Sequence, residues 1–279
     1  MINSNISEMK VIVSHDVDHI TAWEHKKNLI LPKFLMRNAL ELIIKQIGLS
    51  EYLSRYKIIF NNKWQNLAEI MEFDRQNAVP STFFLAVNNG LGLSYPIKDT
   101  EYWLKRILLN GFKVGVHGIA CDSYESIKNE FETFNQIAGS NEQAGIRIHY
   151  LRCNDHTLSN LSNVGYTYDS SLLRMINPFR VDKMWEFPLH IMDGYFICRN
   201  SRWQNQSFCE AKENTKKILE ELYNKNIKYI TILFHDCYFS DSFRTWKEWY
   251  IWLVDYLKIN KVVFISYTDA VKELDSNDE

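Results

Sequence analysis

The chain has 279 residues, 46% of them hydrophobic and 14% aromatic, and its formal net charge is −2 at pH 7. This composition can fill one large core, and the near-neutral charge excludes nucleic acid as a bulk electrostatic partner. No apolar stretch reaches the roughly 18 residues of a membrane span, so we expect no transmembrane segment. The N-terminus lacks a signal-peptide h-region, and the five cysteines show no paired spacing. We therefore expect reduced thiols and a cytoplasmic location.

The first predicted strand runs directly into four ionisable side chains. Val11–Val13 is a β-branched run typical of a buried strand, and Asp16 and Asp18 follow it. Alternation along an extended chain puts both carboxylates on one side, with His15 and His19 displaced from them. Two carboxylates on one side suit a metal ligand beside a general base. The alternative is a strand that simply ends in a solvated turn.

The segment at about 23–61 is predicted as a helical insertion. Its first helical pattern covers 23–48 and is interrupted by Pro32, with one apolar side and several lysines between Lys26 and Lys45. Such a basic amphipathic helix either lies on a membrane surface or packs as a cover over the domain.

The rest of the chain alternates between strand and helix patterns. Such alternation is typical of parallel βα units, and no Pro-, Gly- or Ser-rich linker divides them. We therefore expect an α/β fold in one domain spanning 1–279, a distorted (β/α) barrel with about seven parallel strands. Asp122 and Glu125 resemble a capping box that opens one helix. Strands are predicted over 82–87, 113–116, 146–151, 166–169, 229–234 and 262–266, helices over 64–76, 100–109, 122–138, 210–224, 243–257 and 268–274, and an irregular β region over 185–195.

Polar side chains recur where the predicted strands end. Barrel enzymes place catalysis at the C-terminal ends of their strands, so we expect these side chains to converge. Carboxylates and imidazoles from separate strands match a catalytic divalent metal site with open positions. A bound metal that polarises a carbonyl, a base for water and an acid for a leaving amine together provide amide hydrolysis. The side chains concerned are Asp16, Asp18, His117, Arg147, His149, Asp169 and His235.

The order of four short motifs resembles the polysaccharide deacetylase (NodB-homology, carbohydrate esterase) family. They are Ser-His-Asp-Val-Asp at 14–18, Val-Gly-Val-His-Gly at 114–118, Arg-Ile-His-Tyr at 147–150 and Leu-Phe-His at 233–235. The first motif is similar to a subgroup that reads His-Asp-Val-Asp, and so is the segment at 165–172. The resemblance implies a NodB-like distorted barrel.

The resemblance also implies a role for each matching residue. Asp16 matches the general base, and Asp18 and His117 match metal ligands. Arg147 matches the arginine that orients the catalytic carboxylate. His235 matches the general acid that protonates the departing amine.

Two departures from the family pattern leave the third ligand open. The second histidine of the family's His-x-x-x-His motif is Cys121 here, and cysteine is a competent zinc ligand. His149 replaces the proline of the Arg-x-Pro-Tyr motif and is the other candidate. We expect one divalent ion, zinc, with Tyr150 and Trp185 contacting substrate. Asp193 orients the general acid, contacts substrate or forms a structural turn.

These inferences predict a metal-dependent hydrolase that removes an acetyl group from an N-acetylated sugar or sugar conjugate. The expected context is surface-polysaccharide biosynthesis, on a nucleotide-linked or lipid-linked sugar, with peripheral membrane contact through the basic helix. One alternative is an amidohydrolase acting on a non-sugar amide. Another is a non-catalytic carbohydrate-binding relative that has lost its metal. A serine esterase is disfavoured because the chain has no Gly-x-Ser-x-Gly elbow.

Overall fold

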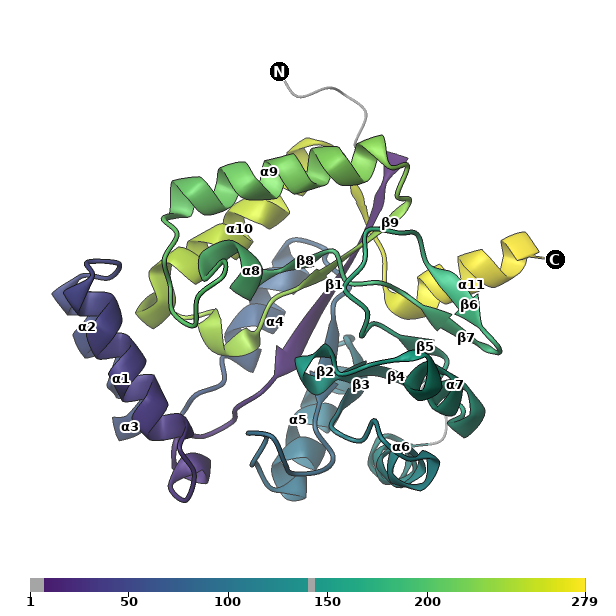
Figure 1. The fold of residues 1–279 in the computed structure, drawn as a ribbon, viewed down its shortest axis with the longest axis horizontal. Helices are drawn as coiled ribbons and strands as arrows, with labels where there is room; N and C mark the ends of the chain where they lie inside the picture. Colours follow the sequence, from purple (N-terminus) through teal and green to yellow (C-terminus); the bar gives the residue numbers. More distant parts are fainter. Residues whose placement is uncertain (1–7, 140–143, 279) are drawn as a thin grey trace.

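The computed structural model describes residues 8–139 and 144–278 and is built around a ten-stranded sheet (Figure 1). Neighbouring strands follow the order β6-β7-β5-β4-β3-β2-β1-β9-β8, and β10 pairs separately with β1. All pairs are parallel except β6 with β7. The strands are β1 Lys10–Val17, β2 Thr82–Leu85, β3 Lys113–Gly118, β4 Gly145–Ile148, β5 Tyr168–Asp169, β6 Phe179–Val181, β7 Met184–Glu186, β8 Ile191–Met192, β9 Tyr229–Leu233 and β10 Val263–Phe264.

Helices cover the outside of the curled sheet, as βαβ crossovers require. The predicted distorted (β/α) barrel is therefore confirmed. No helix among the described residues is long and apolar enough to cross a membrane. The α-helices are α1 Ile30–Ile43, α2 Leu49–Arg55, α3 Lys57–Phe60, α4 Leu67–Gln76, α5 Ile97–Leu109, α6 Tyr124–Ala138, α7 Asp155–Val164, α8 Asp193–Ile197, α9 Phe208–Asn224, α10 Arg244–Ile259 and α11 Tyr267–Asp278. The 3-10 turns are η2 Trp23–His25, η3 His149–Leu151, η4 Asp236–Tyr238 and η5 Asp241–Phe243.

Side-chain alternation along β1 divides the strand between two environments. Val11 and Val13 pack in the layer between sheet and helices, whereas Ile12 packs inside the barrel. Ser14 and Asp16 share the inward side with Ile12, because side chains two residues apart point the same way. The strand thus carries a polar end above an apolar base.

Aromatic side chains fill the barrel below that polar end. Tyr168 and Tyr267 stack with ring centroids 4.7 Å apart and planes 10° apart. Both are fully buried beside Phe84 and Phe187. Gly145 lies against this layer, where an added Cβ would come within 2.0 Å of the Tyr168 ring. Any side chain at Gly145 would therefore displace the aromatic layer.

Residues 23–61, which we expected as a helical insertion, contain η2, α1, α2 and α3 between β1 and α4. Figure 1 shows α1 and α2 at the margin of the molecule, away from the sheet. Pro32 does not interrupt a helix as predicted. It lies in the first turn of α1, where proline removes no intrahelical hydrogen bond.

Two local predictions are wrong. Helix α6 is capped by Ser123, whose hydroxyl accepts the N–H of Ser126, and Asp122 precedes the cap. The segment from Asp193 forms helix α8 instead of continuing the irregular β region. At the start of α6 two neighbouring polar residues, Asp122 and Ser123, compete for the same cap, and local sequence does not decide which one wins.

Candidate metal and catalytic site

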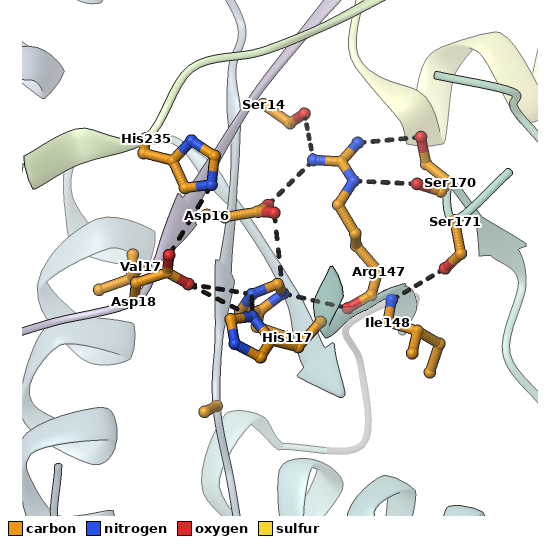
Figure 2. A network of polar contacts seen from close by, with 12 residues as sticks. Ser14, Asp16, Val17, Asp18, His117, Arg147, Ile148, Ser170, Ser171 and His235 are labelled. Atoms are coloured by element: carbon orange, nitrogen blue, oxygen red, sulfur yellow. Dashed lines mark hydrogen bonds and ion pairs between the residues drawn. The ribbon is translucent and has the colours of Figure 1, made fainter. Parts of the chain in front are cut away.

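The candidate site lies where several parallel strands end, as barrel architecture predicts. Asp16 belongs to β1 and Asp18 follows it directly, while His117 belongs to β3. Arg147 comes from β4, and His235 follows β9 by two residues. Parallel pairing keeps these ends level, for example His117 opposite Arg147. Figure 2 shows the side chains pointing toward one another.

Asp18, His117 and His149 form a compact group of possible ligands. The Oδ1 atom of Asp18 lies 3.2 Å from Nε2 of His117 and 3.5 Å from Nδ1 of His149. The two imidazole nitrogens are 2.9 Å apart. Neighbouring ligands of a tetrahedral zinc ion lie about 3.3 Å apart, given metal–ligand distances of roughly 2.0–2.2 Å.

The surroundings of these atoms also fit a metal ion. Nδ1 of His117 lies 3.1 Å from the Arg147 carbonyl, which fixes its proton there and directs the Nε2 lone pair toward Asp18. Asp18 Oδ1 is buried and has no hydrogen-bond donor among the described residues. A buried carboxylate oxygen facing imidazole nitrogens is best satisfied by a cation. The O,N,N donor set suits zinc and leaves positions for water and substrate.

Protonation of Asp18 and His149 matches what metal binding requires. Burial disfavours the imidazolium of His117, but Asp16 and then Asp18 outweigh it and raise the pKa of His117, so a metal ion bound there would displace a proton. Burial opposes ionisation of Asp18, but the close contact with His117 and the charges of His235 and His149 hold its pKa well below the ordinary value. Burial lowers the pKa of His149 to about 4, against the attraction of Asp18. The carboxylate is therefore ionised and His149 neutral at pH 7.

Asp16 is held by the fully buried Arg147 (Figure 2). Nη1 of Arg147 donates to Asp16 Oδ1 at 3.0 Å and to Ser14 Oγ at 2.8 Å. Its Nη2 donates to the hydroxyls of Ser170 and Tyr267, both at 2.9 Å. The other Asp16 oxygen lies 3.8 Å from Nδ1 of His117. One carboxylate oxygen is thus fixed, and the second faces the metal-ligand group.

Asp193 holds His235 on the side of Asp18 opposite to Asp16. Its Nδ1 lies 2.9 Å and 3.1 Å from the two Asp193 oxygens, and its backbone N–H donates to the same carboxylate at 2.8 Å. Nε2 points toward Asp18, 3.8 Å from Oδ2. Burial disfavours the imidazolium, but Asp193 first and then Asp18 outweigh it and raise the pKa of His235 to about 10. His235 is therefore a protonated acid at neutral pH.

The structure does not bring Cys121 or Trp185 to this group. The Cys121 thiol is buried, its partner is Asp122 at 3.4 Å, and burial raises its pKa. Trp185 lies within the aromatic layer, with Nε1 donating to Asp275 and its ring under Arg180. Neither side chain contacts the Asp18 group in the structure.

Tyr150 lies at the rim of the site. Its ring packs on His149 with centroids 3.9 Å apart, yet the residue is 69% exposed. It adopts a left-handed φ of 59°, which is uncommon outside glycine and asparagine. An exposed ring fixed beside a ligand can stack on a substrate.

A pocket of about 270 Å³ opens beside Asp18 and His235. Its walls also include Arg37 from α1 and the segment from Met192 to Arg202. Sequence reasoning singled out only Asp193 from this segment. The pocket gives a substrate access to His235 from the α8 side.

A second imidazole group next to Asp18 also escaped sequence reasoning. His19 Nδ1 lies 2.8 Å from His25 Nε2, which is 3.1 Å from Glu24 Oε1. Asn28 contacts the far nitrogen of His25 at 3.1 Å. These groups satisfy one another and fix the His19 ring against Trp64. The i, i+5, i+6 spacing of His19, Glu24 and His25 was the only available signal.

The sheet and its helices have the fold of solved structures described as polysaccharide deacetylases, a fold shared with an allantoinase. A Mycobacterium smegmatis protein described as a polysaccharide deacetylase matches 100% of this chain and 93% of its own, with a TM-score of 0.65 and 15% identity. Puue allantoinase matches 96% of this chain and 90% of its own, with a TM-score of 0.65 and 12% identity. A protein of Pseudomonas aeruginosa PAO1 described as a polysaccharide deacetylase matches 96% of this chain and 91% of its own, with a TM-score of 0.64 and 11% identity. No protein-family model and no curated protein matches the sequence.

Proposed function

We propose that the protein is a metal-dependent hydrolase that removes an acetyl group from the nitrogen of an amino sugar. The observation that carries the proposal is the Asp18–His117–His149 group flanked by Asp16 on one side and His235 on the other. A base and an acid on opposite sides of a metal position are what amide hydrolysis requires. The shared fold with polysaccharide deacetylases supports it.

The side chains divide the reaction between them. Zinc bound by Asp18, His117 and His149 would polarise the amide carbonyl and activate water. Asp16 accepts the proton of the attacking water, and Arg147 holds that carboxylate in place. His235 donates its Nε2 proton to the nitrogen as the C–N bond breaks, and Asp193 stabilises the imidazolium beforehand. Acetate and a free amine are the products.

The proposal is tested by incubating the zinc-loaded protein with N-acetylglucosamine conjugates and measuring acetate and new primary amine. We expect both products in equal amounts and none after treatment with a chelator. Release of acetate from an O-acetylated sugar, with none from the N-acetylated conjugates, would indicate an esterase. No product from any sugar, but hydrolysis of small cyclic or linear amides, would establish the non-sugar alternative.

The non-sugar alternative stays open at the level of the fold, since the match to an allantoinase is as strong as that to the deacetylases. The exposed Tyr150 ring favours a sugar, because aromatic faces at the rim of a site suit stacking on a pyranose. The non-catalytic alternative requires a lost metal site, and three donor atoms within 3.5 Å of one another speak against it.

The proposal includes a cytoplasmic role in surface-polysaccharide assembly, on a carrier-linked sugar. The five cysteines, none of them in a disulfide, support a reducing compartment.

Support for membrane proximity comes from α1, where Leu29, Met36 and Ile43 recur every seven residues and are 68%, 70% and 75% exposed. A seven-residue repeat puts them on one helix face. Exposed lysines, Lys33 and Lys45, accompany this stripe.

Peripheral membrane contact through this stripe predicts binding to anionic lipid vesicles. Substituting Met36→Ser with Ile43→Ser, or Lys33→Glu with Lys45→Glu, should each reduce co-sedimentation by about tenfold. The loss follows because buried apolar area and basic charge both contribute to interfacial binding. The control pair Lys105→Glu with Lys128→Glu makes the same charge change elsewhere on the surface. Equal co-sedimentation of all forms would contradict a membrane role for α1. Concentration-dependent dimers that are lost in the serine variant would instead show that the stripe contacts a second copy of the chain.

A further inference from the structure

The pocket beside the candidate metal site has a wall of arginines. Arg37 of α1 and Arg199 and Arg202 of the segment after α8 line the same space as Asp18 and His235. Two distant parts of the chain thus contribute guanidinium groups to one opening. A molecule that reaches His235 through this pocket passes these three side chains.

Arg37 is fixed in this wall with unused donor capacity. Its Nε donates to Glu41 at 2.8 Å, and its side chain is 25% exposed. The two terminal nitrogens have weak partners, the Tyr238 hydroxyl at 3.4 Å and the Cys198 thiol at 3.7 Å. A guanidinium edge is strongest with two anionic oxygens, and neither partner is an anion.

The charge of the wall is not cancelled by its own carboxylates. Glu41 also binds Arg55 at 2.5 Å, so it is shared between two guanidiniums. Arg199 and Arg202 are exposed and line the pocket. The one carboxylate whose charge interacts with Arg199 among the described residues is Glu210, and that carboxylate is already bound at the Ser207 cap of α9 and does not line the pocket. Of the carboxylates that line the pocket, Asp193 is bound to His235 and Asp18 faces the metal-ligand imidazoles. The wall therefore presents positive charge toward its occupant.

We propose that Arg37, Arg199 and Arg202 form a subsite for a phosphate group carried by the amino sugar. The proposal rests on the proposed function and narrows its substrate class to sugars joined through phosphate to a carrier. Phosphate fits because its several anionic oxygens can engage more than one guanidinium at once. The pocket volume of about 270 Å³ suits one sugar unit better than several, as it lies below the roughly 300–1,000 Å³ of larger ligand sites.

The test compares affinities of the zinc-loaded protein by calorimetry. The ligands are N-acetylglucosamine 1-phosphate, UDP-N-acetylglucosamine, a short prenyl diphosphate N-acetylglucosamine and the neutral methyl N-acetylglucosaminide. We expect the phosphorylated ligands to bind at least tenfold more tightly than the methyl glycoside, with a preference that weakens at high salt. Whichever of the UDP and prenyl diphosphate compounds binds with the higher affinity identifies the carrier.

The double variant Arg199→Gln with Arg202→Gln should remove most of this preference and leave the methyl glycoside affinity unchanged. Both residues are exposed, so their substitution leaves the core intact. The control Arg75→Gln with Arg244→Gln makes the same charge change on α4 and α10, outside the pocket, and should retain the preference. A preference that survives in the pocket variant would assign phosphate binding to the metal and overturn the subsite. Tighter binding of a carboxylated amino sugar than of the phosphate would also overturn it.

The two proposals can fail separately. Selective binding of phosphorylated sugars without release of acetate would contradict the proposed function and leave the subsite standing. Acetate release with the same KM from neutral and phosphorylated sugars would contradict the subsite and leave the hydrolase standing.

Discussion

Replacing Asp18 or His117 by alanine should abolish stoichiometric metal binding and reduce acetate release by at least about 10³-fold. A metal ion supplies several kcal/mol of charge stabilisation to the reaction, and about 1.4 kcal/mol corresponds to each factor of ten in rate. Each variant removes one of three donor atoms that lie within 3.5 Å of one another. Elemental analysis of the purified proteins, together with initial rates, checks both effects.

The matched control is Asp255→Ala, an exposed carboxylate on α10 that does not line the pocket. It should retain metal and rate. His149→Ala should lose metal as Asp18→Ala does, whereas Cys121→Ser should keep it, because the thiol faces Asp122 and not the ligand group. Metal retained in His149→Ala and lost in Cys121→Ser would reverse this assignment of the third ligand. Absence of metal from the wild-type protein after incubation with zinc, cobalt and nickel would favour the non-catalytic alternative.

Replacing Asp193 by asparagine should lower kcat by about 10²- to 10⁴-fold near neutral pH, the usual contribution of a positioned general acid. Asp193 is the main attraction that raises the pKa of His235 to about 10, so its neutralisation moves that pKa toward the ordinary 6.5. A group whose pKa is raised stays protonated at pH values below that raised pKa. Activity that needs the imidazolium is therefore present at lower pH and is lost as pH rises through the pKa. The alkaline limb of the pH–rate profile should move to lower pH in the variant.

This shift distinguishes proton transfer from a structural role. Asp193 also accepts the backbone N–H of His235, so a folding defect would lower the rate equally at every pH. An unchanged alkaline limb with reduced rate would count against His235 as the acid. Thermal melting of the variant at pH 6 and pH 9 reports whether the fold itself is affected.

Much of the candidate site could be predicted from the sequence, because polar residues that follow apolar runs mark the ends of strands. Asp16, Asp18, His117, Arg147 and His235 each follow an apolar run, and parallel pairing brings such ends to one edge. The alternation that separates His15 from Asp16 and Asp18 also holds in the structure. His15 bonds to Asp74 and the Phe234 carbonyl among the outer helices.

The side chains beyond the strand ends could not be placed in this way. Cys121 has the spacing of a family ligand, but the loop after β3 turns its thiol toward Asp122 before α6 begins. Trp185 sits on a three-residue strand, too short for alternation to tell the interior from the rim. Asp193 contacts a residue 42 positions later in the chain, a distance over which local patterns carry no information.

The stacked aromatic layer beneath Arg147 gives the site a closed floor. Phe84, Tyr168, Phe187 and Tyr267 are all fully buried, and together they fill the barrel below Arg147. A long glycan cannot thread through the protein and can only lie across the strand ends. Under the proposed function, acetate and the deacetylated sugar would leave by the same opening through which the substrate enters. We therefore expect the products to compete with the substrate for that opening.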